Sequence, residues 1–234
     1  MKFRGMLGLA LVCIFAAGCA TPSLEPAVSE RIRSRDIGAA VVLLDKSIQY
    51  HEMVYKVLWN ETRSHSSTFE GFWDVDKELT SSMVGAMGEV GIKARPISSA
   101  LNEKQYSEFV TSLKQTRASD GTNAPLALGP SAKRALKKAG IGSVAVIRSS
   151  KFFVSTTSMN STGMMNIPSV LIVYDLESGT QEYLASFPIG GGIKWGDSVR
   201  NIESDNLKIL REASPDWVKA SVRRQMPKVF SITP

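Results

Sequence analysis

Cys19 is the residue whose setting most plainly suggests chemistry, because its thiol directly follows the small residues 16–18. A cysteine thiol can act as a nucleophile or carry a covalent group. The chain starts with the basic residues Lys2 and Arg4, and an uncharged apolar segment separates them from the small residues. This order is typical of a secretory signal peptide, and the apolar segment is shorter than the roughly 20 residues that a membrane-spanning helix needs. The pattern therefore predicts a cleaved signal peptide over residues 1–18.

The segment Ala16-Ala17-Gly18-Cys19 resembles the lipobox of bacterial lipoprotein signals, with Ala16 where Leu, Val or Ile is usual. The resemblance implies that Cys19 is lipidated on sulfur, becomes the N-terminus after cleavage and is acylated again, with fatty acids such as palmitate. Two acyl chains hold a protein stably on a bilayer. In lipoproteins of double-membraned bacteria, a residue other than Asp after the cysteine, here Ala20, goes with the outer membrane. We therefore expect a lipid-anchored envelope protein that, in such a cell, faces the periplasm from the outer membrane.

The rest of the chain has an ordinary globular composition. Of its 234 residues, 43% are hydrophobic and 21% are charged, which is typical of a folded domain. The formal charge of +6 falls to +4 when Lys2 and Arg4 leave with the signal, and so mild a charge does not call for a nucleic-acid partner. The two cysteines are Cys13, inside the signal, and Cys19. We expect no disulfide and no cysteine-based metal site or nucleophile in the mature domain.

The two histidines, His51 and His65, lack the neighbours that a metal or catalytic site requires. No converging His, Asp or Glu residues stand at helical or hairpin ligand spacing, so we expect no metal and no cofactor. A serine hydrolase could use either ring at long range, but the chain has no Gly-x-Ser-x-Gly motif. We expect a protein that is not an enzyme, and we keep an envelope hydrolase that uses His65 or His51 as an alternative.

Ser155–Ser169 is rich in Ser, Thr and Asn and contains Met159, Met164 and Met165. Methionine side chains are flexible and polarizable, which suits an adaptable protein or lipid contact. The alternative is a hairpin loop that folds back on its own sheet. The segment lacks the alternating stretches of about ten residues that membrane-spanning strands need, which disfavours a pore.

Gly190-Gly191-Gly192 precedes Trp195 in a segment that only partly matches a phosphate-binding loop. Such a loop needs Gly-x-x-x-x-Gly-Lys followed by Ser or Thr, whereas Asp197 follows Gly196 here. We expect a plain loop after the last strand, with Trp195 packed on the domain or gripping a partner.

A basic face is expected on the last helix, with Lys219, Arg223, Arg224 and Lys228 on it. Such a face is usually only solvated. On a domain held near a membrane it could instead meet an anionic headgroup, a glycan or a partner protein.

Apolar patterning predicts a single α/β (or α+β) domain over residues 37–234, after a lipidated Cys19 and flexible tether over residues 19–36. Strands are expected near 39–44, 53–59, 92–97, 143–154, 170–176 and 181–188, and helices near 72–90, 106–113, 131–139 and from 214 onward. The first helix lies between strands and predicts a parallel βαβ crossover in a mixed, twisted sheet. Glu177–Thr180 predicts a C-terminal hairpin, and Ser214-Pro215-Asp216 the capped start of a final amphipathic helix.

This order of elements, with Leu58-Trp59-Asn60-Glu61-Thr62-Arg63 and the hairpin around Asp175–Gly179, resembles the curli-secretion-lipoprotein-like α/β fold. That group is similar to outer-membrane lipoprotein activators of penicillin-binding proteins and to flagellar and polysaccharide-export accessories. The resemblance spans about residues 37–230 and brings no catalytic residue with it. It implies a non-enzymatic module that binds an envelope protein or glycan; an oligomeric secretion or assembly component is the other alternative.

Overall fold

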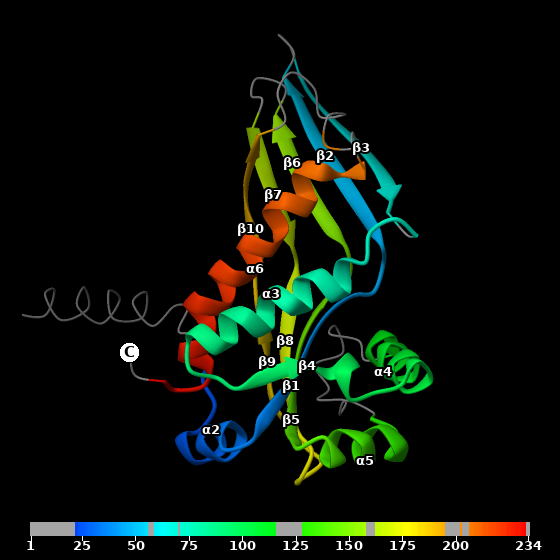
Figure 1. Cartoon of the computed structure of the whole chain (residues 1–234). Coiled ribbons are helices and arrows are strands. Elements are labelled where there is room, and N and C mark those ends of the chain that lie inside the picture. The colour runs from blue at the N-terminus through cyan, green and yellow to red at the C-terminus, as the bar shows by residue number, and fades with distance from the viewer. Residues whose placement is uncertain are drawn as a thin grey trace, which may run out of the picture.

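Four long strands that bend midway organise the molecule and divide it into a lower and an upper sheet (Figure 1). The computed structural model describes residues 22–55, 59–69, 71–115, 128–157, 162–194, 202 and 206–232. The signal peptide, Cys19, Met159 and Trp195 lie outside the described residues. The long strands are β1 (Asp36–Leu43) with β2 (Ser47–Tyr55), β5 (Ile141–Ser149) with β6 (Phe152–Thr157), β7 (Thr162–Ile167) with β8 (Ser169–Asp175), and β9 (Gln181–Ser186) with β10 (Ile189–Lys194).

The shorter strands β3 (Asn60–Thr68) and β4 (Ala94–Pro96) complete the two sheets. The lower sheet has the order β4-β1-β5-β8-β9, and the upper sheet has the order β10-β7-β6-β2-β3. β1 is parallel to β4 and β5, β2 is parallel to β6, and the other neighbours are antiparallel. The sheets are therefore mixed, and the parallel pair β1 and β4 confirms the predicted crossover, which passes through α3 (Val75–Glu89).

The alternation of buried side chains shifts by one residue at two of the four bends. In β1 the odd-numbered residues from Ile37 face the main core, whereas in β2 the even-numbered Ile48 and Tyr50 do. The same shift separates Ile147 of β5 from Phe152 of β6. Because side chains in a strand point alternately to opposite faces, each shift needs one extra residue at the bend.

One face of both sheets packs against α3 and α6 (Lys208–Val229), and we call it the inner face. The core between them contains Val41, Leu79, Met83 and Val222, all with 0% exposure. α3 also completes the hydrogen bonding of β1 beyond its short pairing with β4. Thr80 Oγ1 accepts from the N–H of Val41 at 2.8 Å, and Asp76 Oδ1 accepts from the N–H of Leu43 at 3.0 Å.

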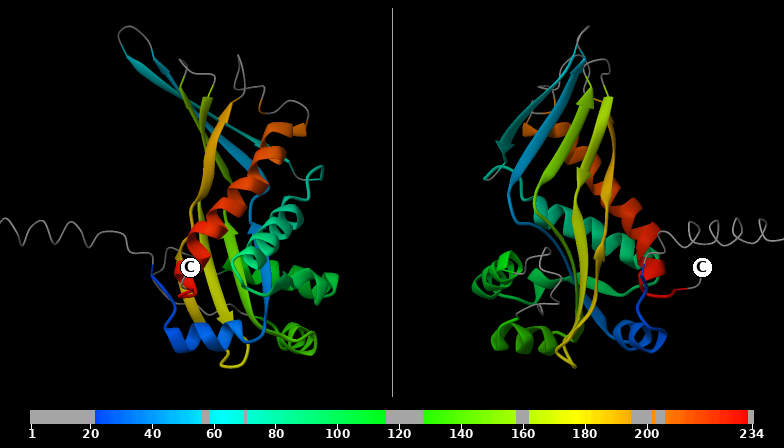
Figure 2. Two further views of the ribbon diagram at one scale, coloured as in Figure 1. Left: turned by 60° about the vertical axis from the view of Figure 1, so that its left-hand side comes forward. Right: turned by 180° about the vertical axis from the view of Figure 1, so that it is seen from behind.

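On the opposite, outer face, the helices among the described residues lie on the lower sheet. α4 (Glu103–Gln115) and α5 (Pro130–Lys138) cover it there with Phe109, Leu113 and Leu136. Seen from behind, in the right-hand view of Figure 2, the described helices leave the outer face of the upper sheet uncovered. The layer of helices α4 and α5 on the outer face therefore ends at the bend between the two sheets.

The N-terminal segment differs from the predicted flexible tether. Residues 26–33 form a helix, α2 (Pro26–Arg33), and Leu24 and Ile32 are each only 3% exposed in the main core. The sequence signals of a tether here were Pro22 and Pro26 and mixed charge. Pro26 instead takes the first helical position, where a missing N–H costs no hydrogen bond.

The C-terminal half contains two further differences from the predictions. The final helix begins at Lys208, and Ser214 and Pro215 lie inside it rather than at its start. Pro215 removes one helical hydrogen bond. Leu210 and Val218 on either side of it have 0% exposure, and the burial of these two side chains stabilises the helix on both sides of the proline. The predicted loops at 155–169 and 190–194 are largely strand, because they form most of the β6–β7 hairpin and β10.

Candidate functional site

The uncovered outer face of the upper sheet is the first part of the candidate site. Strand register places on it side chains from all five strands: Gln49, His51, Met53, Thr62, Ser64, Ser66, Phe153, Ser155, Met164, Asn166 and Lys194. Met53 is 40% exposed and Met164 is 52% exposed, which is unusual for side chains on the broad face of a sheet. Large apolar side chains left on one uncovered face mark a place where another molecule can be bound.

Aromatic and cationic groups are held together near the centre of this face. The His51 ring stacks on Phe153 with centroids 5.9 Å apart and an interplanar angle of 5°. Lys151 Nζ lies 5.7 Å from the centroid of Phe153, within the range of a cation–π contact. His51 Nδ1 also makes a 2.9 Å hydrogen bond with Ser64 Oγ. These contacts position the rings and keep a positive charge beside them.

His65 lies on the other face of the same strand pair. Its ring stacks on Tyr50 with centroids 4.4 Å apart and an interplanar angle of 12°. The two histidines are therefore on opposite faces, and neither lines the groove described below.

Charge is divided between the two faces of the upper sheet. The register places Glu52, Glu61 and Arg63 on the inner side, where Arg63 Nε and Glu61 Oε1 are 3.2 Å apart. Interaction with Glu61 and Glu52 raises the pKa of Arg63. The outer face, by contrast, has Lys151 and Lys194 and no carboxylate among its described residues.

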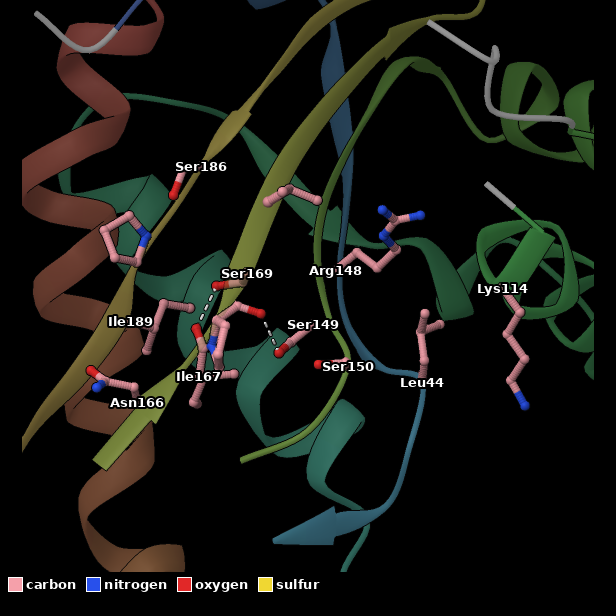
Figure 3. A pocket seen from close by; sticks show the side chains of 13 residues that line it. Leu44, Lys114, Arg148, Ser149, Ser150, Asn166, Ile167, Ser169, Ser186 and Ile189 are labelled. Carbon is pink, nitrogen blue, oxygen red and sulfur yellow. Dashed lines mark hydrogen bonds between the residues drawn. The ribbon is translucent and has the colours of Figure 1, made fainter. Parts of the chain in front are cut away.

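A groove crosses the long strands at the bend and forms the second part of the site (Figure 3). Its volume is about 770 Å³, within the range of small-ligand and peptide pockets. It meets the outer face at Asn166, which pairs with Phe153. Its lining residues are Leu44, Lys114, Arg148, Ser149, Ser150, Asn166, Ile167, Pro168, Ser169, Val170, Ser186, Pro188 and Ile189.

One wall of the groove is cationic. Figure 3 shows Arg148 of β5 and Lys114 of α4 on the same side, with Leu44 between them. Arg148 is 6% exposed, and its Nη1 donates to the Leu113 carbonyl at 3.1 Å. Burial lowers the pKa of this guanidinium, which nevertheless stays protonated in proteins. None of the lining residues is acidic, so the wall suits an anionic group.

The floor of the groove is held rigid by its own hydrogen bonds. Ser149 Oγ donates to the Pro168 carbonyl at 2.6 Å, and Ser169 Oγ lies 2.6 Å from the Phe187 carbonyl. From the inner side, Gln225 of α6 donates to the Pro188 carbonyl at 3.1 Å. These bonds secure the bend, and the exposed side chains of Ser150, Asn166 and Ser186 remain directed to the groove.

The structure divides the sequence-predicted partner contacts. Met164 lies on the outer face, whereas Met165 is fully buried in the core, because neighbouring residues of a strand face opposite ways. The prediction that Met165 contacts a partner was therefore wrong. Lys219 pairs with Asp216 at 3.1 Å, and Arg223 pairs with Glu89 at 2.5 and 3.0 Å. Arg224 is exposed.

Arg223 also lowers the pKa of Glu89. Sequence reasoning missed Lys114, Arg148 and Lys151. A single arginine after the apolar run Val144–Ile147 was the signal that could have found Arg148.

Comparison with known proteins found no matching family model and no matching curated protein. Two solved bacterial structures are similar. The first is the LpoB C-terminal domain from Salmonella enterica, with 12% identity, 73% of this chain and 96% of that chain covered, and a TM-score of 0.23. The second is lipoprotein GNA1162 from Neisseria meningitidis, with 13% identity, 78% and 99% coverage, and a TM-score of 0.30. Both TM-scores are low, and the function proposed below rests on this chain alone.

Within the described residues, no helix combines the length and apolar character needed to cross a bilayer. No three His, Cys, Asp or Glu side chains in that part of the chain are grouped as metal ligands.

Proposed function

We propose that this chain is a lipid-anchored protein of the cell envelope that binds a partner protein and catalyses no reaction itself. The observation that carries the proposal is the outer face of the upper sheet, which exposes Met53 and Met164 where the lower sheet is covered by helices. The anchor is supported by the signal that ends at Cys19. In a double-membraned cell, Ala20 supports an outer-membrane position facing the periplasm.

The chemistry of the face supports one kind of partner. Lys151 and Lys194 give it positive charge, no carboxylate lies on it among the residues that the structure describes, and the groove adds Lys114 and Arg148. Phe153 and the two exposed methionines supply apolar contact area. Opposite charge on two surfaces favours their encounter and fixes their register. We therefore expect the partner to present an acidic segment with apolar side chains.

The anchor is tested by comparing the chain with a Cys19→Ala variant. Wild type should incorporate radiolabelled palmitate and fractionate with membranes, and the variant should do neither. Unchanged labelling and membrane association in the variant would refute the anchor.

The partner surface is tested by placing a photoreactive side chain at Met164 in cells. The control position is Phe72, which is 45% exposed but lies outside the outer face. We expect a discrete adduct from position 164 only, weakened by Lys151→Glu and Lys194→Glu and unaffected by Lys93→Glu, an exposed lysine elsewhere. Equal adducts from both positions, or an adduct indifferent to the two charge reversals, would contradict the proposed surface.

A hydrolase is a second candidate because Ser64 Oγ and His51 Nδ1 are 2.9 Å apart, as in a nucleophile and base pair. Its test is labelling with a fluorophosphonate. An adduct that disappears in Ser64→Ala supports a hydrolase, and an unlabelled wild-type protein argues against one.

A further inference from the structure

The N-terminal segment is hydrogen-bonded to the folded domain from Pro22, three residues after Cys19. The hydroxyl of Tyr183 donates to the Pro22 carbonyl at 3.0 Å. The N–H of Leu24 donates to the Val229 carbonyl at 2.8 Å, and Ser231 Oγ donates to the Leu24 carbonyl at 3.1 Å. The domain therefore holds its own N-terminal segment from Pro22 onward.

This contact limits how far the domain can stand from a membrane. Three Cα–Cα steps join Cys19 to Pro22, and at 3.80 Å each they span at most about 11 Å. An acylated cysteine has its chains in the hydrocarbon layer, and the headgroup region adds about 5–7 Å on each side of that layer. The surface around Pro22 must then lie at or within a few ångströms of the headgroups.

The structure identifies which surface that is. The bonds from Leu24 place it beside the C-terminal end of α6, and Figure 1 shows this end of α6 close to α2 and far from the free ends of β2 and β3. Arg224 and Lys228 are one turn apart on α6 and are exposed. Neither forms an ion pair with another described residue, in contrast to Lys219 and Arg223.

We propose that the mature domain rests directly on the bilayer through the surface formed by α2 and the C-terminal half of α6, with Arg224 and Lys228 against anionic lipid headgroups. The proposal rests on the acylation of Cys19 proposed above. Glu25, at the N-cap of α2, and Glu30 are exposed carboxylates of this surface, and Arg31 and Arg33 of α2 balance their charge. The net positive charge therefore comes from α6. Each cation near an anionic membrane strengthens binding by about fivefold. The upper sheet is then held at a fixed orientation rather than moving on a long tether.

The acylated protein permits a clean labelling experiment, because Cys19 is the only cysteine left after the signal. A fluorescent dye is attached to Ala220→Cys, one turn before Arg224 on α6, or to Ser66→Cys on the upper sheet; both positions are exposed. The proteins are reconstituted in vesicles that contain headgroup-spin-labelled lipid, which quenches nearby dyes. We expect strong quenching at 220 and little at 66. Equal quenching at the two positions, or none at 220, would overturn the proposal.

A linker variant separates the basic surface from the short connection. Twelve Gly and Ser residues inserted after Thr21 should preserve quenching at 220 in vesicles with anionic lipid and reduce it in neutral vesicles. Arg224→Glu with Lys228→Glu should remove the anionic-lipid effect, whereas Lys104→Glu on α4 should leave it. Quenching indifferent to the double reversal would refute the role of these cations. Failure of the acylated protein to sediment with any vesicle would instead refute the anchor itself.

Discussion

Gly191 of β10 provides the sharpest test of how α6 packs on the upper sheet. A Cβ built on Gly191 would lie 2.2 Å from Nε1, 2.7 Å from Cδ1 and 2.9 Å from Cε2 of Trp217. All three atoms belong to a rigid ring, so Gly191→Ala must displace Trp217 or move α6. The neighbouring Gly192 points to the outer face, and the nearest atom to a methyl group added there would be the Gly163 carbonyl oxygen at 3.9 Å.

The comparison between Gly191→Ala and Gly192→Ala isolates the loss of stability caused by the steric overlap with Trp217. Replacing a strand glycine by alanine stabilises by roughly 0.5–1 kcal/mol through the unfolded chain, and this gain is common to both variants. Overpacking costs about 1–3 kcal/mol and applies only to Gly191→Ala. We therefore expect that variant to be less stable than Gly192→Ala by about 1–3 kcal/mol. For a domain of this size the difference corresponds to a lower Tm by about 2–12 °C.

Chemical and thermal unfolding followed by circular dichroism measure this difference. In a Trp217→Ala background the two alanine substitutions should become equivalent, because the ring that the methyl group meets is gone. Equal stability of the two single variants would refute the reasoning, as would a difference that survives unchanged without the Trp217 ring.

Two further predictions concern α3 and the N-terminal segment. Burial raises the pKa of Asp76 from its ordinary 3.8, so the folded state binds a proton at this carboxyl more tightly than the unfolded state does. The stability that this proton contributes is present at acid pH and is lost as the pH rises through the raised pKa of the folded state. Denaturant titrations from acid to neutral pH should therefore show wild type losing stability relative to Asp76→Asn, which keeps the acceptor for Leu43; a pH-independent difference would contradict this. Leu24→Ala should lower the free energy of unfolding by about 2–5 kcal/mol because Leu24 is buried. The same substitution in a flexible tether would leave the free energy of unfolding almost unchanged, and equilibrium unfolding measures the difference.

The elements that sequence patterning predicted well are those whose signals are local. The helical repeat from Phe72 to Val90 and the turn at Gly179, which has φ +73°, need only neighbouring residues to be recognised. The fold class followed from their order. Patterning failed at Ser214-Pro215, where good capping residues lie inside a helix because contacts with the sheet outweigh the local signal.

The candidate site was less predictable because its residues meet only through long-range pairing. Met164 was found from its residue type, but its separation from Met165 depends on strand register. Lys114 and Arg148 are far apart in the chain and line one wall because α4 ends at the bend of β5. No pattern of neighbouring residues in the sequence indicates at which point along a sheet the covering helices end.

The sequence by itself indicated the features that are read residue by residue: the mixed α/β pattern, the lack of a recognised catalytic motif, and the export signal with Cys19 after it, which stay predictions. Tertiary structure alone decided which strand face stays uncovered, how the bends open a cationic groove and how close Pro22 lies to the end of α6. The physical reason is that propensity and periodicity act between neighbours along the chain. Register, layer boundaries and the docking of a terminal segment depend on contacts between residues as distant as Leu24 and Val229.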